Sequence, residues 1–226
     1  MALAGLDVGT SGCKMVVFDL KGDVICSEQS GYSEYGDDGI REISPKEVIE
    51  SVFDVIRRAA KSSPEPIEAF AVASLGESAV CVGADGEYLC NSMVTGDKRG
   101  IEEALILADR FGRGHIMELT GLPASEMYAL PKLMWLNAHT NALKAARFVF
   151  CYEDFVGYML TGKRKISYSL ASRTMMFDIN RYKWNEELMQ VVGLDGTKLS
   201  TPCQTGEIVG RVLPEIAKEL GLSDST

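Results

Sequence analysis

Short runs of apolar and polar residues open the chain. Residues 3–35 contain the runs LAGLDV, KMVVFD and VICSEQSGYS, separated by the turn sequences GTSG and LKGD. Runs rich in β-branched residues and bounded by Gly and Asp are typical of antiparallel strands joined by tight turns. The pattern therefore predicts a three-stranded meander at the start of the fold.

A helical period replaces this pattern after residue 44. Apolar side chains then recur at the spacing of one helix face, at Val48, Val52, Val55, Ile56 and Ala59. Ser44 suits the N-cap, Pro45 the first helical position and Glu47 the third, so we expect a capping box at the start of this helix. The buried face of the helix is expected to cover the meander.

The rest of the chain alternates between helix and strand patterns. IEAFAVASL predicts a buried strand, AVCVGADGEYLC a hairpin with an Asp-Gly turn, and RFVFCYE a short strand. Helices are expected over residues 100–119 and 131–145, in EDFVGYMLTG with Gly162 as its stop, and in the tail PEIAKELGLSDST. A meander followed by alternating helices and strands predicts an α/β domain with a mixed sheet and flanking helices.

Composition and charge narrow the function classes. The 226 residues are enough for one large domain or two small ones, and 46% hydrophobic with 24% charged residues is ordinary for a globular protein. The net charge of −9 disfavours nucleic acid as the main partner, because phosphate neutralisation needs a basic face. A small anionic ligand needs only local donors, so it is not excluded.

The chain shows no sign of membrane association. No apolar run reaches membrane-spanning length, and the start MALAGLDVGTSG lacks a basic region and reaches Asp7 too soon for a signal peptide. We therefore expect a cytoplasmic protein with no membrane partner.

Cysteine and histidine usage limits the available chemistry. The six cysteines are scattered among apolar neighbours without a CxxC pair, so we interpret them as reduced core thiols rather than disulfides or zinc ligands. The two histidines, His115 and His139, both lie in polar stretches. A histidine-based hydrolase or a multi-histidine metal site is therefore poorly supported.

The stretch LDVGTSGCKMVVFD combines an acid, a glycine-rich turn and a lysine. Close backbone approach, N–H groups, two hydroxyls and one positive charge suit a phosphate, and they come from Gly9, Thr10, Ser11, Gly12 and Lys14. Asp7 would repel phosphate directly, so it would instead hold Mg²⁺ through water. A plain glycine-rich hairpin turn is the alternative, and the GxxxxGK[ST] pattern of a Walker A loop is absent.

The same glycine-rich segment resembles that of a known protein family. DVGTSGCKMVVFD resembles the first phosphate loop of the actin-like ATPase superfamily, and the chain as a whole resembles the N-terminal domain of FGGY-family carbohydrate kinases. The segments that carry this resemblance follow in the family's order: AFAVASLGESAVCVGADGEYLCNSMVTGDKR, ELTGLP, LPKLMWL, DFVGYMLTG and SYSLASRTMMFDINRYKW. The resemblance covers residues 1–226 and implies one ribonuclease-H-like domain that phosphorylates a sugar or polyol hydroxyl with ATP and Mg²⁺.

The resemblance also implies the substrate-binding positions. Gly76 and Glu77 fall where family members contact the substrate, and a carboxylate can accept hydrogen bonds from neighbouring hydroxyls. Asp97 matches the acid of the family's acid-x-Arg element, and Tyr128 falls near another substrate-lining position. Glu77 as a turn residue and Asp97 as a helix N-cap are the alternatives.

The position of the family's catalytic base is substituted. The family segment resembles TDYSxASRTMxFDI, and in ISYSLASRTMMFDI the aspartate position is Ser167. Serine is no base near neutral pH unless another base lies beside it. Three interpretations stay open: a catalytically impaired sugar-binding or regulatory member, an engineered variant, or a nearby acid that substitutes. The acids considered are Glu77, Asp97 and Asp154, although Asp154 is better explained as a helix N-cap.

The expected partners are a small-molecule sugar or polyol and a second kinase lobe. By resemblance, a C-terminal lobe carries the adenine-binding segments and a second phosphate loop, and no second glycine-rich phosphate motif occurs in this chain. The sugar and the oligomeric state are left open, with a homodimer among the alternatives. A third hypothesis, an actin-like assembly or chaperone role, is disfavoured by LPKLMWL and SYSLASRTMMFDI, which resemble sugar kinases.

Overall fold

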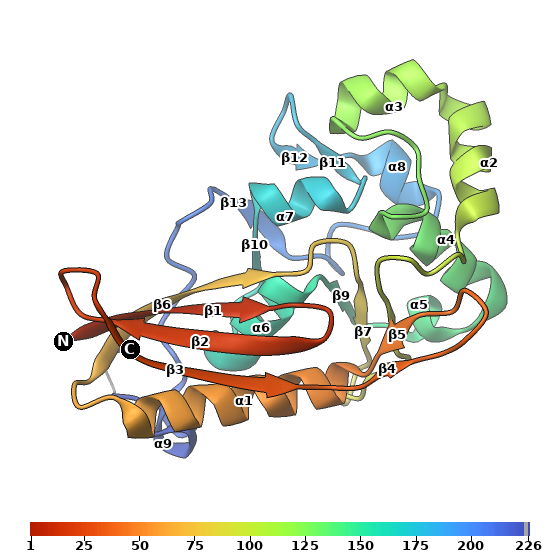
Figure 1. Ribbon diagram of the computed structural model, residues 1–226. Helices are drawn as coiled ribbons and strands as arrows, with labels where there is room; N and C mark the ends of the chain where they lie inside the picture. Colours follow the sequence, from red (N-terminus) through yellow and green to blue (C-terminus); the bar gives the residue numbers. More distant parts are fainter. Residues whose placement is uncertain (224–225) are drawn as a thin grey trace.

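In the computed structural model, which describes residues 1–223 and 226, four strands form a mixed sheet in the half of the fold that holds both chain ends (Figure 1). The sheet order is β3-β2-β1-β6: β2 pairs antiparallel with both β1 and β3, whereas β6 pairs in parallel with β1. The strands are β1 (Ala2–Val8), β2 (Gly12–Phe18), β3 (Val24–Gly31) and β6 (Ile67–Ser74). The predicted meander and the α/β class with a mixed sheet are confirmed.

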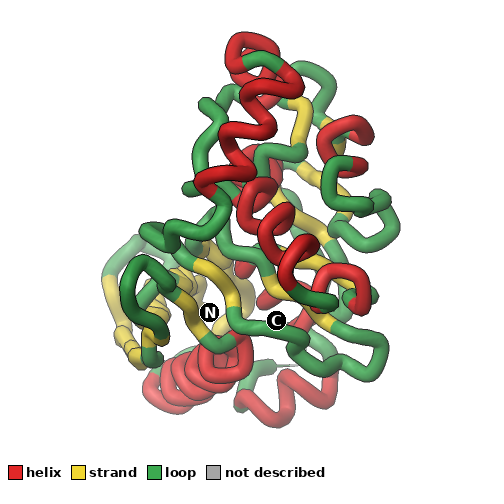
Figure 2. Tube along the Cα trace, turned by 90° about the vertical axis from the view of Figure 1, so that its right-hand side faces the viewer, coloured by secondary structure: helices red, strands yellow, loops and turns green. Residues whose placement is uncertain are grey.

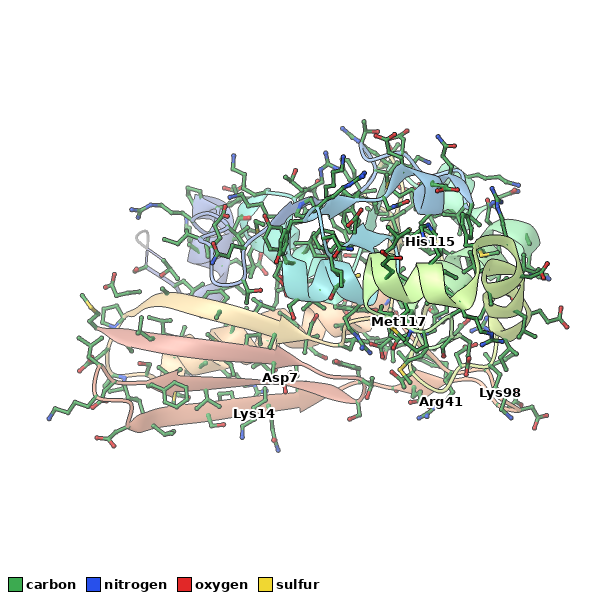
Figure 3. All side chains as sticks on the ribbon, turned by 90° about the horizontal axis from the view of Figure 1, so that it is seen from above. Asp7, Lys14, Arg41, Lys98, His115 and Met117 are labelled. Atoms are coloured by element: carbon green, nitrogen blue, oxygen red, sulfur yellow. The ribbon has the colours of Figure 1, made fainter. Side chains whose placement is uncertain are left out.

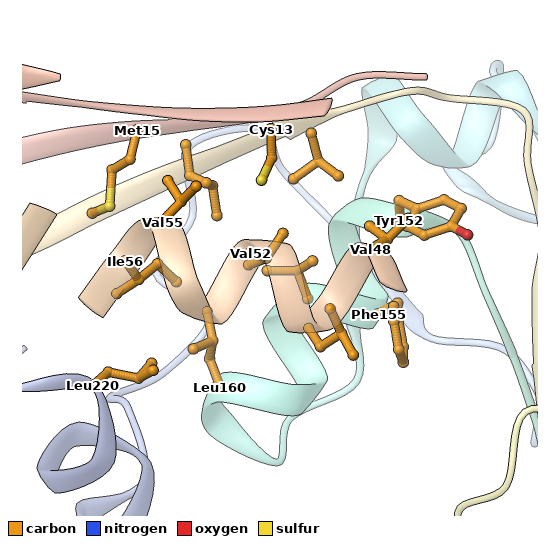
Figure 4. Packing of buried hydrophobic residues seen from close by; sticks show 14 of the residues in the cluster. Cys13, Met15, Val48, Val52, Val55, Ile56, Tyr152, Phe155, Leu160 and Leu220 are labelled. Carbon is orange, nitrogen blue, oxygen red and sulfur yellow. The ribbon is translucent and has the colours of Figure 1, made fainter. Parts of the chain in front are cut away.

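Helix α1 (Pro45–Ser62) covers one face of this sheet. The five apolar residues predicted to form its buried face are all buried, and they pack beneath Cys13 and Met15 of β2 (Figure 4). Helices α6 (Tyr152–Thr161) and α9 (Pro214–Leu220) complete this layer. Because burial alternates along β1 and β2, the opposite face of the sheet stays exposed.

The start of α1 differs from the predicted capping box. The Ser44 hydroxyl accepts a hydrogen bond from the Glu47 N–H at 3.4 Å, as expected. The Glu47 carboxylate does not return to the cap: one oxygen accepts the Ser33 N–H at 3.3 Å and the other accepts the Tyr35 hydroxyl. The second half of the capping box is therefore wrong, because donors from the segment after β3 occupy this carboxylate.

A second apolar cluster lies beyond the sheet, away from the two chain ends (Figure 1). Figure 2 shows the same arrangement from the side. The cluster is built mainly from α2 (Ile101–Phe111), α3 (Arg113–Thr120), α4 (Ala129–His139), α5 (Ala142–Ala145), α8 (Glu186–Gln190) and the antiparallel pair β7 (Val80–Val82) and β9 (Phe148–Phe150).

Two predicted helices are divided in the structure. The helix expected over 100–119 breaks at Gly112, whose φ of 80° is not helical, and continues as α3. The helix expected over 131–145 begins earlier, at Ala129, and ends at His139 before the separate turn of α5. Pro131 is tolerated because it lies in the first turn of α4, where backbone N–H groups have no helical partner.

The other predicted elements agree more closely. The hairpin after β7 closes with a Val82–Tyr88 bridge and a hydrogen bond from the Gly83 N–H to the Glu87 carbonyl. Gly162 ends α6 in the left-handed conformation, as expected. The prediction that β6 is buried is wrong: only Ile67 is buried, and the residues after it alternate between half-buried and exposed along a strand at the edge of the sheet. The predicted tail helix ends at Leu220, and positions 224–225 of that prediction lie outside the described residues.

Several short elements had no strong sequence signal. They are β4 (Glu34–Tyr35), β5 (Glu42–Ile43) and β8 (Ser92–Met93), which form one sheet, the parallel pair β10 (Lys165–Ser167) and β13 (Thr201–Cys203), helix α7 (Tyr168–Arg173), and the hairpin of β11 (Phe177–Asp178) and β12 (Lys183–Trp184). Among the described residues, no helix is both long and apolar enough to cross a membrane. All six cysteines are free thiols, and four of them are buried.

Candidate functional site

Two loops leave the central sheet at the same edge. Strands β1 and β6 are parallel, Val8 lies opposite Ser74, and the Leu75 N–H donates to the Val8 carbonyl at 2.9 Å. The turn 9–12 therefore begins next to the segment 75–78. Ligands of open α/β sheets bind outside the carboxyl ends of such strands. The structure thus brings the predicted phosphate turn and the predicted substrate segment together.

The glycine-rich turn is held from behind by Tyr32. The hydroxyl of the half-buried Tyr32 lies within hydrogen-bonding distance of the carbonyl oxygens of Gly9 and, at 3.1 Å, of Gly12. Burial raises the pKa of Tyr32, so its hydroxyl stays protonated and can donate. With these carbonyl groups bound, the turn can offer N–H groups and hydroxyls of residues 10–11 to an anion.

Asp7 and Lys14 lie opposite each other on β1 and β2 and are exposed on the open face of the sheet (Figure 3). Among the described residues, no group of three or more His, Cys, Asp or Glu is placed to hold a metal ion. Mg²⁺ is commonly bound through one or two carboxylates together with water and substrate phosphates. A single accessible carboxylate at Asp7 therefore fits a magnesium ion that arrives with a nucleotide, and His115 on α3 lies well apart from it (Figure 3).

A set of buried and half-buried charged side chains lies beside the segment 75–78. We call it the polar cluster, and it consists of Glu77, Asp97, Arg99, Lys132 and Arg173. Its members come from the loop after β6, the loop after β8, helix α4 and helix α7. Burying a charge is costly unless it is paired, so the ion pairs within the cluster are what allow it to form.

Glu77 is connected to Tyr128 through Arg173. One oxygen of the Glu77 carboxylate accepts the Thr95 hydroxyl, and the other lies 3.5 Å from Arg173 Nη2. The Arg173 guanidinium stacks over the Tyr128 ring at 4.9 Å, and 37% of the Arg173 side chain is exposed. A Cβ at Gly76 would lie 3.0 Å from Arg173 Cγ, so a glycine here permits the close approach. Gly76, Glu77 and Tyr128 therefore all lie against Arg173.

Asp97 is held by four N–H groups. The side chain is fully buried, and it accepts hydrogen bonds from the backbone N–H groups of Arg41 and Arg99 and from Nε and Nη2 of Arg99. Arg99 also pairs with Glu42 at 2.7 Å. Burial alone would raise the pKa of Asp97, but these hydrogen bonds and the charge of Arg99 outweigh it and lower the pKa. The N-cap alternative for Asp97 is wrong, since Gly100 caps α2.

Lys132 is a member of the cluster that the sequence analysis missed. Its side chain is buried in α4, and its Nζ donates to the Val94 carbonyl at 3.2 Å. Burial lowers the pKa of Lys132 to about 8, although the negative charges of Glu77 and Asp97 partly oppose this shift. The available signal was a single lysine inside the apolar run ALPKLMWL.

Ser167 is bound by a carboxylate that the sequence analysis also missed. The Ser167 hydroxyl donates to Glu153 Oε2 at 2.9 Å, and its backbone N–H donates to Glu153 Oε1 at 3.0 Å. Burial raises the pKa of Glu153 and outweighs the lowering effect of these two hydrogen bonds. Ser167 also caps α7, because its hydroxyl accepts the Leu170 N–H at 3.2 Å.

Asp154, the neighbouring acid, has a different role from the predicted one. The N-cap of α6 is Cys151, whereas Asp154 occupies the third helical position and accepts the Cys151 N–H at 2.8 Å. Its other oxygen accepts the Ser200 hydroxyl at 2.6 Å. Burial raises the pKa of Asp154 to about 8, and its two hydrogen bonds describe a structural position. The N-cap prediction for Asp154 is wrong by three positions.

Comparisons with known proteins agree on one family. The family model described as "FGGY family of carbohydrate kinases, N-terminal domain" matches residues 2–226. The chain is 28% identical over 227 residues to a gluconokinase of Bacillus subtilis, with 99% of this chain and 44% of the relative covered. It is 29% identical over 220 residues to a glycerol kinase of Thermococcus gammatolerans, with 93% of this chain and 44% of the relative covered.

A solved structure agrees with these matches. The ligand-bound xylulose kinase of Lactobacillus acidophilus superposes with a TM-score of 0.93 at 25% sequence identity. The superposition covers 100% of this chain and 46% of the xylulose kinase. The chain thus spans less than half the length of the relatives it matches.

Proposed function

The chain belongs to the FGGY family of carbohydrate kinases, and on that premise we propose that it forms the ribonuclease-H-like N-terminal domain of a kinase that transfers a phosphoryl group from ATP to a sugar or polyol hydroxyl. The observation that carries this proposal is the shared sheet edge. There the glycine-rich turn, suited to phosphate, begins beside Glu77, which is suited to hydroxyl groups. Phosphoryl transfer needs just this juxtaposition of donor and acceptor.

The turn is proposed to bind the phosphates of ATP. The groups that would bind them are the backbone N–H groups of the turn, the hydroxyls of Thr10 and Ser11, and the ammonium of Lys14. Asp7 is proposed to hold Mg²⁺, which would neutralise the phosphate charge. Tyr32 supports the turn by binding its carbonyl oxygens.

The polar cluster is proposed to bind the acceptor. Asp97 already accepts hydrogen bonds from four N–H groups, so its proposed part is to hold Arg99 and the loop before α2 in place. Glu77 would then make the direct contact with hydroxyl groups, with Tyr128 as a wall of the site. Since Arg173 is the most exposed member of the ion pairs here, the acceptor would enter from its side.

The chain covers less than half the length of its relatives, which supports a second lobe. Relatives that match nearly the whole chain are more than twice its length. We propose that the remaining lobe of the kinase completes the nucleotide site, and that closure of the two lobes excludes water from the reaction.

The alternative is a sugar-binding or regulatory member with impaired catalysis. The observation that favours it is Ser167 at the position expected for the base, since a serine alone does not accept a proton near neutral pH.

One experiment separates the two proposals. ADP formation is measured with the longest natural form of the protein, Mg²⁺ and ATP, across pentuloses, gluconate and glycerol, and binding of the same compounds is followed by calorimetry. Turnover with one class of acceptor supports the kinase. Binding without turnover supports the alternative, and neither binding nor turnover contradicts both.

A further inference from the structure

We propose that Lys132 is a positioning residue of the acceptor site: it holds the turn 94–97 from the protein interior, and through Thr95 of that turn it keeps the Glu77 carboxylate directed at the acceptor hydroxyls. This inference rests on the proposed kinase function. It goes beyond that function because it gives a part in acceptor binding to a buried lysine that binds the turn rather than the acceptor.

The turn 94–97 carries one exposed hydroxyl on a fixed base. The Asp97 N–H donates to the Val94 carbonyl at 3.2 Å, which closes the turn. The Val94 N–H donates to the Arg41 carbonyl at 3.0 Å, so the start of the turn is held by the segment before β5. Between these two fixed residues, Thr95 is exposed.

Lys132 reaches this turn from α4. Its Nζ donates at 3.2 Å to the Val94 carbonyl, the same oxygen that accepts the N–H closing the turn. The backbone of α4 lies close to the end of the loop after β8, because a Cβ at Gly100 would lie 3.1 Å from the Pro131 carbonyl carbon and 3.2 Å from the Lys132 nitrogen. Only 4% of Lys132 is exposed. The lysine therefore acts on the turn from inside the protein.

Thr95 transmits the position of the turn to Glu77. The Thr95 hydroxyl donates to Glu77 Oε1, and Arg173 Nη2 lies 3.5 Å from Glu77 Oε2. Each oxygen of a carboxylate has two sites that can accept a hydrogen bond. These contacts therefore orient the carboxylate and leave sites free for acceptor hydroxyls. If the turn moved, Thr95 would move with it and the carboxylate would lose this orientation.

The charge of Lys132 suits this position. A buried ammonium is costly unless opposite charges lie near it. Three negative groups and one positive group act on Lys132 from the surrounding elements, and a half-buried thiol lines the same small cavity. These groups are Glu77 in the loop after β6, Asp97 in the loop after β8, Glu126 ahead of α4, Arg173 on α7 and the thiol of Cys90. The ammonium is thus a buried counter-charge for both Glu77 and Asp97.

This arrangement makes acceptor binding depend on pH. Burial lowers the pKa of Lys132 to about 8, so the side chain is charged below that pH and becomes neutral above it. Hydrogen bonds from a charged donor are stronger than those from a neutral one. The hold on the turn should therefore weaken as the pH rises through about 8, and KM for the acceptor should increase.

The test uses Lys132→Met, Thr95→Val and the double variant in the longest natural form, with the acceptor among pentuloses, gluconate and glycerol that the wild type phosphorylates. Each substitution removes the hydrogen-bond donor and keeps most of the side-chain volume. We expect each single variant to raise KM for the acceptor by about 10–100-fold, the range for hydrogen bonds that involve a charged group, with little change in KM for ATP. The double variant should raise KM no further than Lys132→Met, because the lysine acts through the threonine.

A pH profile separates this role from a merely structural one. KM of the wild type for the acceptor should rise above a pH of about 8, whereas Lys132→Met should show a high KM that no longer changes there. Two matched controls should keep the wild-type KM and its pH dependence. They are Lys144→Met, at an exposed lysine of α5, and Cys90→Ser, in the cavity beside Lys132.

The contradicting results are distinct. Wild-type turnover with KM of Lys132→Met for the acceptor within about twofold of the wild-type value would overturn the positioning role and leave the kinase proposal standing. The same holds if the two single effects multiply in the double variant. If Lys132→Met does not fold, an unchanged KM of the exposed Thr95→Val, or a wild-type KM that does not rise with pH, overturns the role. A wild type without turnover on any acceptor would overturn it together with the proposed function.

Discussion

The glycine-rich turn and the polar cluster lie at one edge of the sheet but are built in opposite ways. The turn is local: residues 9–12 join two neighbouring strands, Asp7 and Lys14 are exposed, and Tyr32 is the main outside support. The polar cluster is non-local and mostly buried: Arg99 pairs with Glu42 and Arg173 pairs with Glu77, which lie far away in the sequence. A site for a charged ligand that brings its own metal can stay open, whereas a site that selects among hydroxyl groups needs charges fixed in advance.

The two regions should also differ in how much their charges contribute to stability. Charges in the turn are solvated with or without ligand, so removing one should weaken binding and hardly alter folding. Charges in the polar cluster are desolvated by folding, so removing one leaves its partner buried and unpaired.

The largest expected effect is that of Asp97→Ala. The change leaves Arg99 without its main partner and frees backbone N–H groups of Arg41 and Arg99, so we expect a loss of about 3–5 kcal/mol in the free energy of unfolding. Urea denaturation measures this. Asp7→Ala is the matched control and should change stability by less than about 0.5 kcal/mol. Similar losses for the two variants would contradict the expected difference in stability between the polar cluster and the turn.

The next largest effect is expected at Lys132, which should make stability depend on pH. Its pKa is lowered to about 8 in the folded protein against 10.5 for the free side chain, so the unfolded state binds more protons between these values. Stability should therefore rise with pH in this window, by at most about 1.4 kcal/mol per pH unit. Denaturation of Lys132→Met should lack that rise, whereas the exposed control Lys14→Met should keep it. If the stability of the wild type does not rise with pH in this window, or if Lys132→Met keeps the rise, the lowered pKa of Lys132 is contradicted.

Gly12→Ala tests whether the glycine-rich turn tolerates a side chain at its end. A Cβ at position 12 would lie 2.6 Å from the Ser30 carbonyl oxygen on the neighbouring strand, and that backbone cannot move away cheaply. We expect a loss of about 1–3 kcal/mol in thermal or urea unfolding. Gly9→Ala, whose Cβ would lie 3.3 Å from the Gly12 carbonyl, should lose less. Equal losses of stability for Gly12→Ala and Gly9→Ala would contradict the idea that the close approach of β3 is what requires a glycine at position 12.

Ser78 provides the smallest effect. Its buried hydroxyl has no hydrogen-bond partner within the part of the chain that the structure describes. Ser78→Ala should therefore leave stability unchanged or raise it by up to about 1 kcal/mol. Ser92 is the matched control: its hydroxyl donates to the Ala79 carbonyl at 2.7 Å and accepts from Tyr152 at 3.0 Å, so Ser92→Ala should destabilise. A clear loss for Ser78→Ala would indicate a bound water or ligand at this hydroxyl.

Local patterns account for the parts of the fold that were predicted. The meander and α1 follow from the period of apolar residues and from turn and capping residues, which act within a few positions. Strands β10 and β13 form only by pairing with each other, and the segments lie far apart in the sequence, so no local period marks them.

The candidate site divides in the same way. Resemblance pointed to Gly76, Glu77 and Tyr128, and the structure places them together. Lys132 and Glu153 were missed because each has its role only through partners far along the chain: Val94 lies 38 residues from Lys132, and Ser167 lies 14 residues from Glu153.

The most direct test of the central idea, a phosphate turn and a hydroxyl-binding cluster at one sheet edge, is steady-state ADP formation by the longest natural form and two variants. We predict that Lys14→Met raises KM for ATP with little change for the sugar or polyol, and that Glu77→Gln raises KM for the sugar or polyol with little change for ATP. Absence of ADP formation with every acceptor, or equal effects of both variants on both substrates, would contradict the account.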